Sequence, residues 1–202
     1  MKKCNCADLN LAALPGISKI VCLEEVTSTQ AVARELAMEG TAEKTLVLAE
    51  TQTDGRGRLG REWESGRGGL YMTLLIKPET RLKFLPDLSV LSGEAVAETI
   101  TELYDIKTRI KKPNDVYAWH PRRRKWLKIS GILTESSSIN RAPSWLLLGV
   151  GVNLNNTVKL DAAVSVKAIK GAGVSREEFL AGFFRIFWLR YSAWEYGSQA
   201  KS

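Results

Sequence analysis

Three arginines and three glycines are interleaved in the segment Gly55-Arg56-Gly57-Arg58-Leu59-Gly60-Arg61, and Trp63 follows it closely. Guanidinium groups bind carboxylates and phosphates through paired N–H donors, and backbone amides in a glycine-rich turn can cradle the same anions. Apart from Leu59 the segment has little apolar surface, and its glycines increase the entropy lost on ordering. We therefore expect a cationic loop that folds over an anionic ligand and excludes water from it.

A second polar cluster is Lys111-Lys112-Pro113-Asn114-Asp115. Side chains alternate along a strand, so only one of the two lysines can face a ligand. Pro113 interrupts the strand ladder and leaves Asn114 and Asp115 at its rim. Because Pro-Asn-Asp is also ordinary turn chemistry, this cluster identifies no function by itself.

Two apolar strands carry further candidates. Lys128 enters one strand and Gly131 follows it; the lysine either extends its stem along the strand edge or faces a polar site. Gly149 and Gly151 occupy alternate positions of the next strand and clear one of its faces. That pattern permits the close approach of a planar ligand, and it equally fits a bulge or tight packing.

Composition narrows the class of protein. The 202 residues are 45% hydrophobic, which is enough for one globular domain with a substantial core. No apolar run approaches the length of a membrane span, and the first residues lack the apolar core of a signal peptide, so we expect a cytoplasmic protein without a membrane partner. The formal charge of +7 suits an anionic partner.

The cysteines and the histidine suggest no metal centre. Cys4, Cys6 and Cys22 are an odd number near one end, which does not suggest a disulfide framework. We expect them to be reduced thiols. The single histidine, His120, is far from them in sequence, so no metal site is predicted.

The elements that must position these residues can be read from periodicity and end signals. Helices are predicted over 26–40, with Thr27 or Ser28 as the cap, over 87–104, and over 174–196, where Ser175 and Glu178 form a capping box. Strands are predicted over 44–50, 69–78, 106–115 with a break at Pro113, 116–119, 126–136 and 144–156. Because helices and strands mix without a strict alternation, we predict an α+β domain with helices packed on a mixed sheet.

The clusters occur in an order that resembles the biotin protein ligases, also called biotin–acetyl-CoA-carboxylase ligases. That family has a Ser-Thr start to an early helix, a Gln before a Gly-Arg-Gly-Arg-x-Gly-Arg-x-Trp loop, a Lys-Trp-Pro-Asn-Asp motif, a Lys-x-x-Gly-Ile-Leu strand and a Gly-x-Gly-x-Asn strand. The matching segments here are Ser28–Gln30, Gln52, Gly55–Trp63, Lys111–Asp115, Lys128–Leu133 and Gly149–Asn153. The resemblance implies the biotin–lipoate ligase catalytic fold, which is similar to class II aminoacyl-tRNA synthetases.

The resemblance also implies a reaction. The carboxylate of biotin attacks the α-phosphate of ATP and gives biotinyl-5'-AMP and pyrophosphate. A lysine of a biotin carboxyl carrier protein then attacks this mixed anhydride. Magnesium accompanies the nucleotide without a dedicated set of protein ligands.

By the same resemblance, roles fall on particular residues. The catalytic group is Lys128 with Arg56 and Arg58. The substrate-binding residues are Ser28, Thr29, Gln30, Gln52, Arg56, Gly57, Arg58, Trp63, Lys128, Gly131, Gly149 and Gly151. The nucleotide-binding residues are Arg58, Arg61, Lys111, Asn114 and Asn153.

Two features depart from the family pattern. Lys112 replaces the aromatic residue of the Lys-Trp-Pro-Asn-Asp motif, which raises the alternative of a degenerate ligase that binds biotin without turnover. The run "HPRRRKWLK" at 120–128 is either a solvated hairpin tip or a docking site for an acidic acceptor domain.

We expect a single minimal catalytic domain over 1–202, with an extension over about 1–19, no helix-turn-helix domain and no small C-terminal β-barrel. Sequence-specific DNA binding is therefore not expected, and the sequence leaves a homodimer open. Two rival functions remain. One is a lipoate or octanoate ligase, and the other is a non-enzymatic nucleic-acid-binding domain, which charge and Arg-Gly content would suit.

Overall fold

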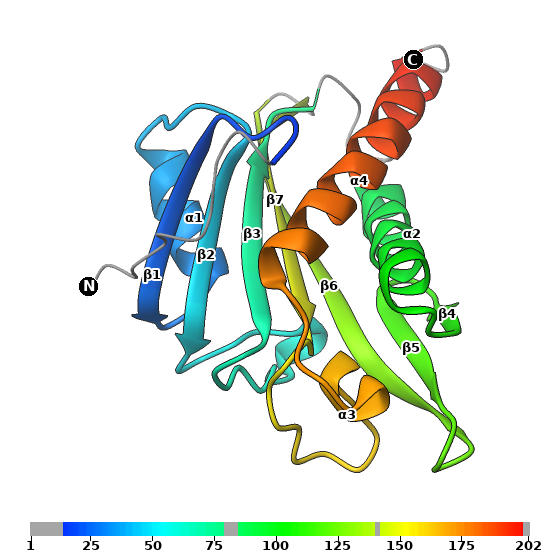
Figure 1. The fold of residues 1–202 in the computed structure, drawn as a ribbon. Helices are drawn as coiled ribbons and strands as arrows, with labels where there is room; N and C mark the ends of the chain where they lie inside the picture. Colours follow the sequence, from blue (N-terminus) through cyan, green and yellow to red (C-terminus); the bar gives the residue numbers. More distant parts are fainter. Residues whose placement is uncertain (1–13, 79–84, 140–141, 200–202) are drawn as a thin grey trace.

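The computed structural model describes residues 14–78, 85–139 and 142–199. They form one seven-stranded sheet in the order β1-β2-β3-β7-β6-β5-β4, with α2 and α4 on one face and α1 on the other (Figure 1). The elements in chain order are β1 (Lys19–Val26), α1 (Thr29–Met38), β2 (Thr45–Gln52), the 3-10 turn η2 (Arg58–Gly60), β3 (Leu70–Ile76), α2 (Leu85–Tyr104), β4 (Thr108–Lys111), β5 (Asp115–His120), β6 (Lys125–Ile139), β7 (Ala142–Val152), α3 (Val166–Lys170) and α4 (Arg176–Gln199).

The sheet is mixed, as the sequence predicts. β1 and β2 are parallel, and the other five neighbouring pairs are antiparallel. The central strands are buried on both faces because each face is covered by a helix layer. In β2, Leu46 and Leu48 join the core under α2 and α4, whereas Val47 and Ala49 pack on the α1 side. The alternation of side chains in one strand thus supplies two cores.

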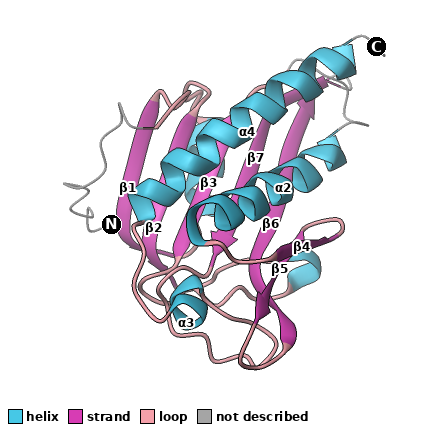
Figure 2. Cartoon of the chain, turned by 45° about the vertical axis from the view of Figure 1, so that its right-hand side comes forward, coloured by secondary structure: helices cyan, strands magenta, loops and turns pink. Residues whose placement is uncertain are grey.

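α2 and α4 lie side by side across the sheet (Figure 2). α4 presents four fully buried phenylalanines, and two of them, Phe183 and Phe187, stack with centroids 5.6 Å apart. On the outer side of the pair, the guanidinium of Arg190 on α4 lies 2.9 Å from Glu94 and 2.5 Å from Glu98 on α2. The helix pair is therefore held by an aromatic core on one side and by ion pairs on the other.

The structure confirms the predicted caps at the starts of two helices. The side chain of Ser28 accepts from the N–H of Gln30 and caps α1, and Ser175 accepts from the N–H of Glu178 at the start of α4. The sequence did not predict the bounds of β1, and it did not predict the short helix α3 or the turn η2. Within the described part of the chain, no helix combines the length and apolar character needed to cross a membrane.

The expectation of reduced thiols is wrong for Cys22. This residue of β1 is disulfide-bonded, and its partner lies outside the described residues. An odd cysteine count leaves at least one thiol unpaired, but it does not prevent a single pair from forming.

One end of the sheet gathers the chain segments that carry the polar clusters. β1 and β2 run towards it and β3 leaves from it, so the start of α1 and the loop 53–69 both lie there (Figure 1). β7 also ends there, beside the start of β5 and the middle of β6. Residues far apart in sequence consequently meet at this end.

Candidate active site

A cavity of about 220 Å³ lies at this end of the sheet. All twelve residues predicted to bind substrate line it, although they come from five separate segments of the chain. Of the five residues predicted to bind nucleotide, Arg58, Arg61 and Asn114 line the cavity. Lys111 and Asn153 do not line it.

One end of the cavity is a hydrogen-bonded polar network. The N–H of Thr29 and its hydroxyl lie 2.8 and 3.2 Å from Oε1 of Gln52, and Nε2 of Gln52 donates to Ser65 at 2.7 Å. The hydroxyl of Thr73 lies 2.9 Å from the hydroxyl of Thr29 and 3.0 Å from Oε1 of Gln30. Buried polar groups that support one another in this way hold a fixed array of donors and acceptors.

The start of α1 explains why these groups face the cavity. Ser28 is the N-cap in extended conformation, and Thr29 and Gln30 form the first turn, where backbone N–H groups have no helical partner. Oε1 of Gln52, the last residue of β2, accepts a hydrogen bond from the N–H of Thr29. The helix thus begins with its polar turn against the cavity and its apolar side chains against the sheet.

The loop after β2 forms a short hairpin of its own. The N–H of Gly57 donates to the carbonyl of Arg61 at 2.7 Å, and Trp63 donates to Gly55 at 2.8 Å. At the tip, Leu59 has a φ of 57° and its side chain is 88% exposed. The segment is therefore more regular than the irregular loop expected from its composition, and its arginines project from a hydrogen-bonded frame.

The loop arginines make few contacts with acidic groups. Arg56 is paired with Asp54 at 3.1 Å, and Arg58 donates to Oδ1 of Asn114 at 3.1 Å. The Arg58 contact joins the loop to the turn between β4 and β5 across the mouth of the cavity. Within the described residues, Arg58 and Arg61 have no ion-pair partner, so they are available to an anion.

Two glycines make room for Trp63. A Cβ at Gly151 would lie 2.5 Å from Nε1 of Trp63, and one at Gly131 would lie 3.1 Å from the ring. Nε1 of Trp63 is buried and has no hydrogen-bond partner among the described residues. The cleared strand face thus accommodates a side chain of the protein, which then forms a wall of the cavity.

Gly149 has a similar role at the polar end. A Cβ there would lie 2.6 Å from Oε1 of Gln30. The sequence suggested that a ligand could approach these glycines directly. In the structure, the space beside them is filled by the side chains of Gln30 and Trp63, which themselves line the cavity.

Lys128 lies where the loop wall and the sheet wall meet. Its ammonium is 2.7 Å from Oδ1 of Asp115 and 5.3 Å from the centre of the Trp63 ring. Both members of this ion pair are largely buried, with 29% and 18% of the side chain exposed. A half-buried lysine held by one carboxylate can exchange that partner for the anion of a ligand.

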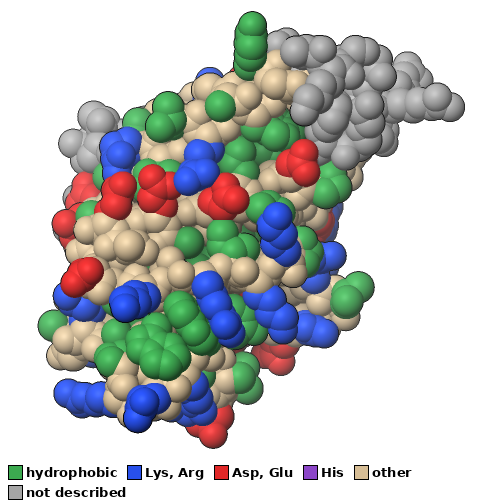
Figure 3. All heavy atoms as spheres, turned by 90° about the vertical axis from the view of Figure 1, so that its right-hand side faces the viewer, with side chains coloured by type: hydrophobic (Ala, Val, Ile, Leu, Met, Phe, Trp, Pro, Cys, Tyr) green, Lys and Arg blue, Asp and Glu red, His purple; other side chains and the backbone are tan. Residues whose placement is uncertain are grey.

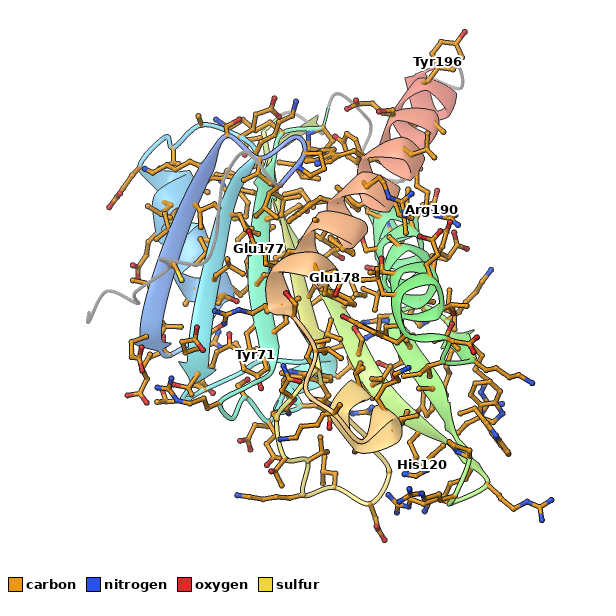
Figure 4. All side chains as sticks on the ribbon, in the orientation of Figure 1. Tyr71, His120, Glu177, Glu178, Arg190 and Tyr196 are labelled. Atoms are coloured by element: carbon orange, nitrogen blue, oxygen red, sulfur yellow. The ribbon has the colours of Figure 1, made fainter. Side chains whose placement is uncertain are left out.

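Tyr71 stabilises the base of the loop (Figure 4). Its hydroxyl donates to the carbonyl of Gly66 at 2.6 Å. Burial, and secondly the nearby carboxylate of Glu64, raises the pKa of Tyr71 well above its usual range. The hydroxyl therefore remains a donor throughout the neutral and moderately alkaline range.

Two predicted residues lie away from the cavity. Lys111 is exposed, with its ammonium 5.9 Å from the ring of Tyr117. Asn153 is buried, and its Oδ1 accepts from Asn156. Lys112, the residue that departs from the family motif, is exposed and precedes the cis peptide at Pro113.

Sequence reasoning missed several lining residues, namely Leu59, Glu62, Tyr71, Met72, Thr73, Asp115, Ile132, Leu133 and Val150. Thr73 and Tyr71 had a detectable signal, since they alternate on the strand that follows the loop. Asp115 was noticed and given no role, because its ion pair with Lys128 depends on the pairing of β5 with β6.

The profile of the Biotin/lipoate A/B protein ligase family matches residues 22–153, which hold every segment of the cavity. The chain belongs to this family.

Over the aligned segments, two relatives of known sequence are each 34% identical to this chain. The bifunctional ligase/repressor BirA of Bacillus subtilis is 34% identical over 173 residues, covering 82% of this chain and 51% of the relative. The biotin–[acetyl-CoA-carboxylase] ligase of Paracoccus denitrificans is 34% identical, covering 78% of this chain and 67% of the relative. The chain thus spans about half the length of the Bacillus relative.

Solved structures of the family have the same fold. The biotin protein ligase from Aquifex aeolicus in complex with biotin and ATP superposes with a TM-score of 0.74 at 31% identity, over 90% of this chain and 74% of that one. The biotin protein ligase from Leishmania major in complex with biotinyl-5-AMP gives a TM-score of 0.68 at 28% identity, over 86% and 75%. These matches confirm the α+β fold predicted from the sequence.

Proposed function

We propose that this chain is a biotin protein ligase. It joins biotin to ATP, giving biotinyl-5'-AMP and pyrophosphate, and then transfers the biotinyl group to a lysine of a biotin carboxyl carrier protein. The observation that carries the proposal is one cavity in which a polar amide-hydroxyl end, the Arg56–Arg61 loop and Lys128 meet. The relatives solved with biotin and ATP, and with the adenylate, support the same choice of ligands.

The cavity suits a ligand with a polar ring at one end and a carboxylate at the other. A ureido ring offers two donors and one acceptor, which the hydroxyls and amides of Ser28, Thr29, Gln30 and Gln52 can match. Trp63 forms a wall beside the ring and chain. In the proposal Lys128 then lies at the carboxylate, near Arg56, Gly57 and Arg58.

The first step brings two anions together. An oxygen of the biotin carboxylate forms a bond to the α-phosphorus of ATP as the bond to pyrophosphate breaks. Lys128, Arg56 and Arg58 offset the charge repulsion, and a site closed to water strengthens each of these contacts. We place the nucleotide against Arg58, Arg61 and Asn114, with Lys111 and Asn153 further out.

In the second step, the neutral amine of the acceptor lysine attacks the acyl carbon. An amide bond forms, the acyl–phosphate bond breaks, AMP departs with its electron pair, and the amine releases a proton. The mixed anhydride also reacts with water, so the loop hairpin over the cavity protects it between the two steps.

Magnesium is implied for the nucleotide, and this ion is usually held by one or two carboxylates together with substrate phosphates. Among the residues that the structure describes, no three or more His, Cys, Asp or Glu cluster in a way that could hold a metal ion. Two carboxylates, those of Glu62 and Asp115, line the cavity, and that of Asp115 is paired with Lys128. In the proposal the magnesium ion enters with the phosphates of ATP. The proposed setting is the cytoplasm, where ATP is available.

The deciding experiment is pyrophosphate release from ATP and magnesium with biotin, lipoate or octanoate supplied in turn. We expect release with biotin alone and biotinyl-5'-AMP in the mass spectrum. Release with lipoate or octanoate would assign the chain to another branch of the family. Release with none of the three would leave a binding-only descendant or a nucleic-acid-binding domain, and Lys112 would be the first residue to restore to an aromatic.

A further inference from the structure

The outer face of β4, β5 and β6 continues from the active-site cavity. The inner face of these strands packs on α2 through Val116, Ala118, Leu127 and Ile129, which are buried. The residues that alternate with them point the other way. On this outer face, cross-strand pairing sets Tyr117 beside Lys128 and Trp119 beside Trp126.

On this outer face, aromatic side chains contact one another and also a cationic side chain. The rings of Trp119 and Trp126 meet edge to face with centroids 5.5 Å apart. The guanidinium of Arg109 on β4 lies 4.7 Å from the Trp126 ring and 5.7 Å from the Tyr117 ring. Arg109, Tyr117, Trp119, Arg122, Lys125 and Trp126 are called here the cationic–aromatic strip.

The strip leads from the reactive end of the cavity to the tip of the β5–β6 hairpin. Tyr117 is the cross-strand partner of Lys128, so the strip begins next to the proposed reaction centre. It ends at Arg122 and Lys125, which are exposed. A partner lying along it would have one end beside the cavity mouth.

The positive charge of the strip is not offset locally. Within the described residues, no carboxylate lies within ion-pair distance of Arg109, Arg122 or Lys125, whereas the neighbouring Arg123 is paired with Asp161 at 2.7 Å. Figure 3, which views the molecule from the β4 side, shows Lys and Arg side chains around exposed hydrophobic ones in the lower part of the view. Arginine and aromatic side chains together are the composition of energetic centres in protein interfaces.

We propose that the cationic–aromatic strip is the docking surface for the acceptor, an acidic protein domain that carries the target lysine. This inference rests on the proposed function, because it supplies the partner of the second step. The position of the strip favours a protein over a nucleic acid. A protein docked there can bring the alkylamine of a lysine to the cavity mouth, whereas a nucleic acid has only weakly nucleophilic base amino groups. Charge complementarity would raise the association rate and select against basic proteins.

The test measures the two steps separately. The variant Arg109→Glu/Lys125→Glu and the wild type would be compared in transfer from added biotinyl-5'-AMP to a purified apo carboxyl carrier domain of net negative charge. We expect kcat/KM for the carrier domain to fall about tenfold or more at low salt in the variant. Pyrophosphate release with biotin and ATP in the absence of the carrier domain should be unchanged.

A matched control separates location from net charge. Lys19→Glu/Lys77→Glu makes the same charge change at exposed residues at the other end of the sheet, at the start of β1 and just after β3. This control should transfer biotin as the wild type does. Added salt should slow transfer by the wild type and the control, because it screens the attraction between the strip and the acidic carrier domain. It should have little effect on the strip variant, in which the substitutions have already removed that attraction.

Each result of these measurements either supports or overturns the proposed docking surface. Wild-type transfer by the strip variant, or an equal loss in both double variants, would overturn the proposal. Binding of a single-stranded oligonucleotide that is lost in the strip variant while transfer is unchanged would assign the strip to nucleic acid and overturn it as well. If the wild type releases no pyrophosphate with biotin, the proposed function fails, and fluorescence anisotropy of the labelled carrier domain with the same variants still tests the strip. A single Lys125→Glu variant at the hairpin covers the case in which the double variant does not fold.

Discussion

Lys128 has two neighbours of opposite character, the carboxylate of Asp115 and the face of the Trp63 ring. The carboxylate forms an ion pair with the ammonium, and the ring covers one side of it. A ligand carboxylate that enters the cavity therefore meets a desolvated, oriented cation, which is the arrangement that stabilises charge in a transition state.

The first prediction concerns that cation. Lys128→Ala should slow biotin-dependent pyrophosphate release about a hundredfold or more, because the two reacting anions then meet without it. Lys19→Ala removes the same group from an exposed site and should have the wild-type rate. Full adenylation by Lys128→Ala would refute the mechanism at its centre.

The second prediction concerns the seat of Gln30. Gly149→Ala places a methyl group 2.6 Å from Oε1 of Gln30, so this amide must move and the polar network must break. Biotin affinity measured by calorimetry should fall about tenfold or more, because a buried polar array loses its geometry. Gly197→Ala, where nothing lies within 4 Å of the new methyl group, should bind biotin normally.

At the scale of single residues, the sequence predicted which residues line the cavity better than it predicted their contacts. The twelve residues predicted to bind substrate all line the cavity, and the sequence could point to them because their order in the chain follows a family pattern. Lys111 could not be placed from the sequence, since only the register of β4 against β5 decides which face it takes. Thr73 was missed because its alternation with Tyr71 places it on one face of β3 but does not show its hydrogen bonds to Thr29 and Gln30.

The loop hairpin is the element that separates the cavity from solvent. Arg58 joins it to Asn114 in the β4–β5 turn. Arg58→Ala should therefore release biotinyl-5'-AMP into solution before transfer, because the loop closes less firmly over the intermediate. The measurement is free adenylate per turnover, by mass spectrometry after rapid filtration. Arg185→Ala on α4 is the matched control, and equal retention by the two variants would contradict the role of the loop.

The β5–β6 hairpin contains the only histidine in the sequence, which makes its titration simple to follow. Burial, and then the charges of Arg123 and Arg122, lowers the pKa of His120 below 6.5 (Figure 4). The folded chain thus binds this proton less readily than the unfolded chain, so its contribution to stability is present above pH 6.5 and is lost as the pH falls below that value.

A proton NMR titration of the single imidazole signal should give a midpoint below 6.5. Arg122→Ala should raise it, and Arg185→Ala should leave it unchanged. A midpoint above 6.5 in the wild type would show that the hairpin arginines lie further from the ring than the structure places them.

Elements were predicted well where periodicity and end signals agreed. Ser28 and Ser175 mark the starts of α1 and α4, and the strands of the core appear within a few residues of their predicted bounds. α3 was missed because five residues are too few for a helical period to show. The hairpin within the Arg/Gly loop was missed because its frame is made of backbone hydrogen bonds, which composition does not report.

At the scale of the whole molecule, the packing of α4 on α2 and the sheet fully buries four phenylalanines of α4. Phe183→Ala should lower the free energy of unfolding by about 3–5 kcal/mol, because a fully buried ring is replaced by a cavity. Leu189→Ala on the same helix, where the side chain is 75% exposed, should cost less than about 1 kcal/mol. Urea unfolding followed by circular dichroism measures both, and equal losses would contradict the assigned packing.

The sheet order could not be derived from the sequence. An α+β class with a mixed sheet follows from the succession of elements, but the placement of β7 between β3 and β6 depends on pairings between distant segments. The disulfide at Cys22 was missed for the same reason, since only the folded chain shows which thiols meet.

The pairing of β3 with β7 has a consequence for the order of events during protein synthesis. Gln30 donates to the carbonyl of Leu147, 117 residues further along the chain, and Gly149 provides its seat. The ribosome must therefore release β7 before the cavity has its last wall. A nascent chain that lacks these residues has an incomplete cavity. Capture of labelled biotin, the proposed ligand, by stalled chains of increasing length would therefore show the chain length at which the cavity becomes complete.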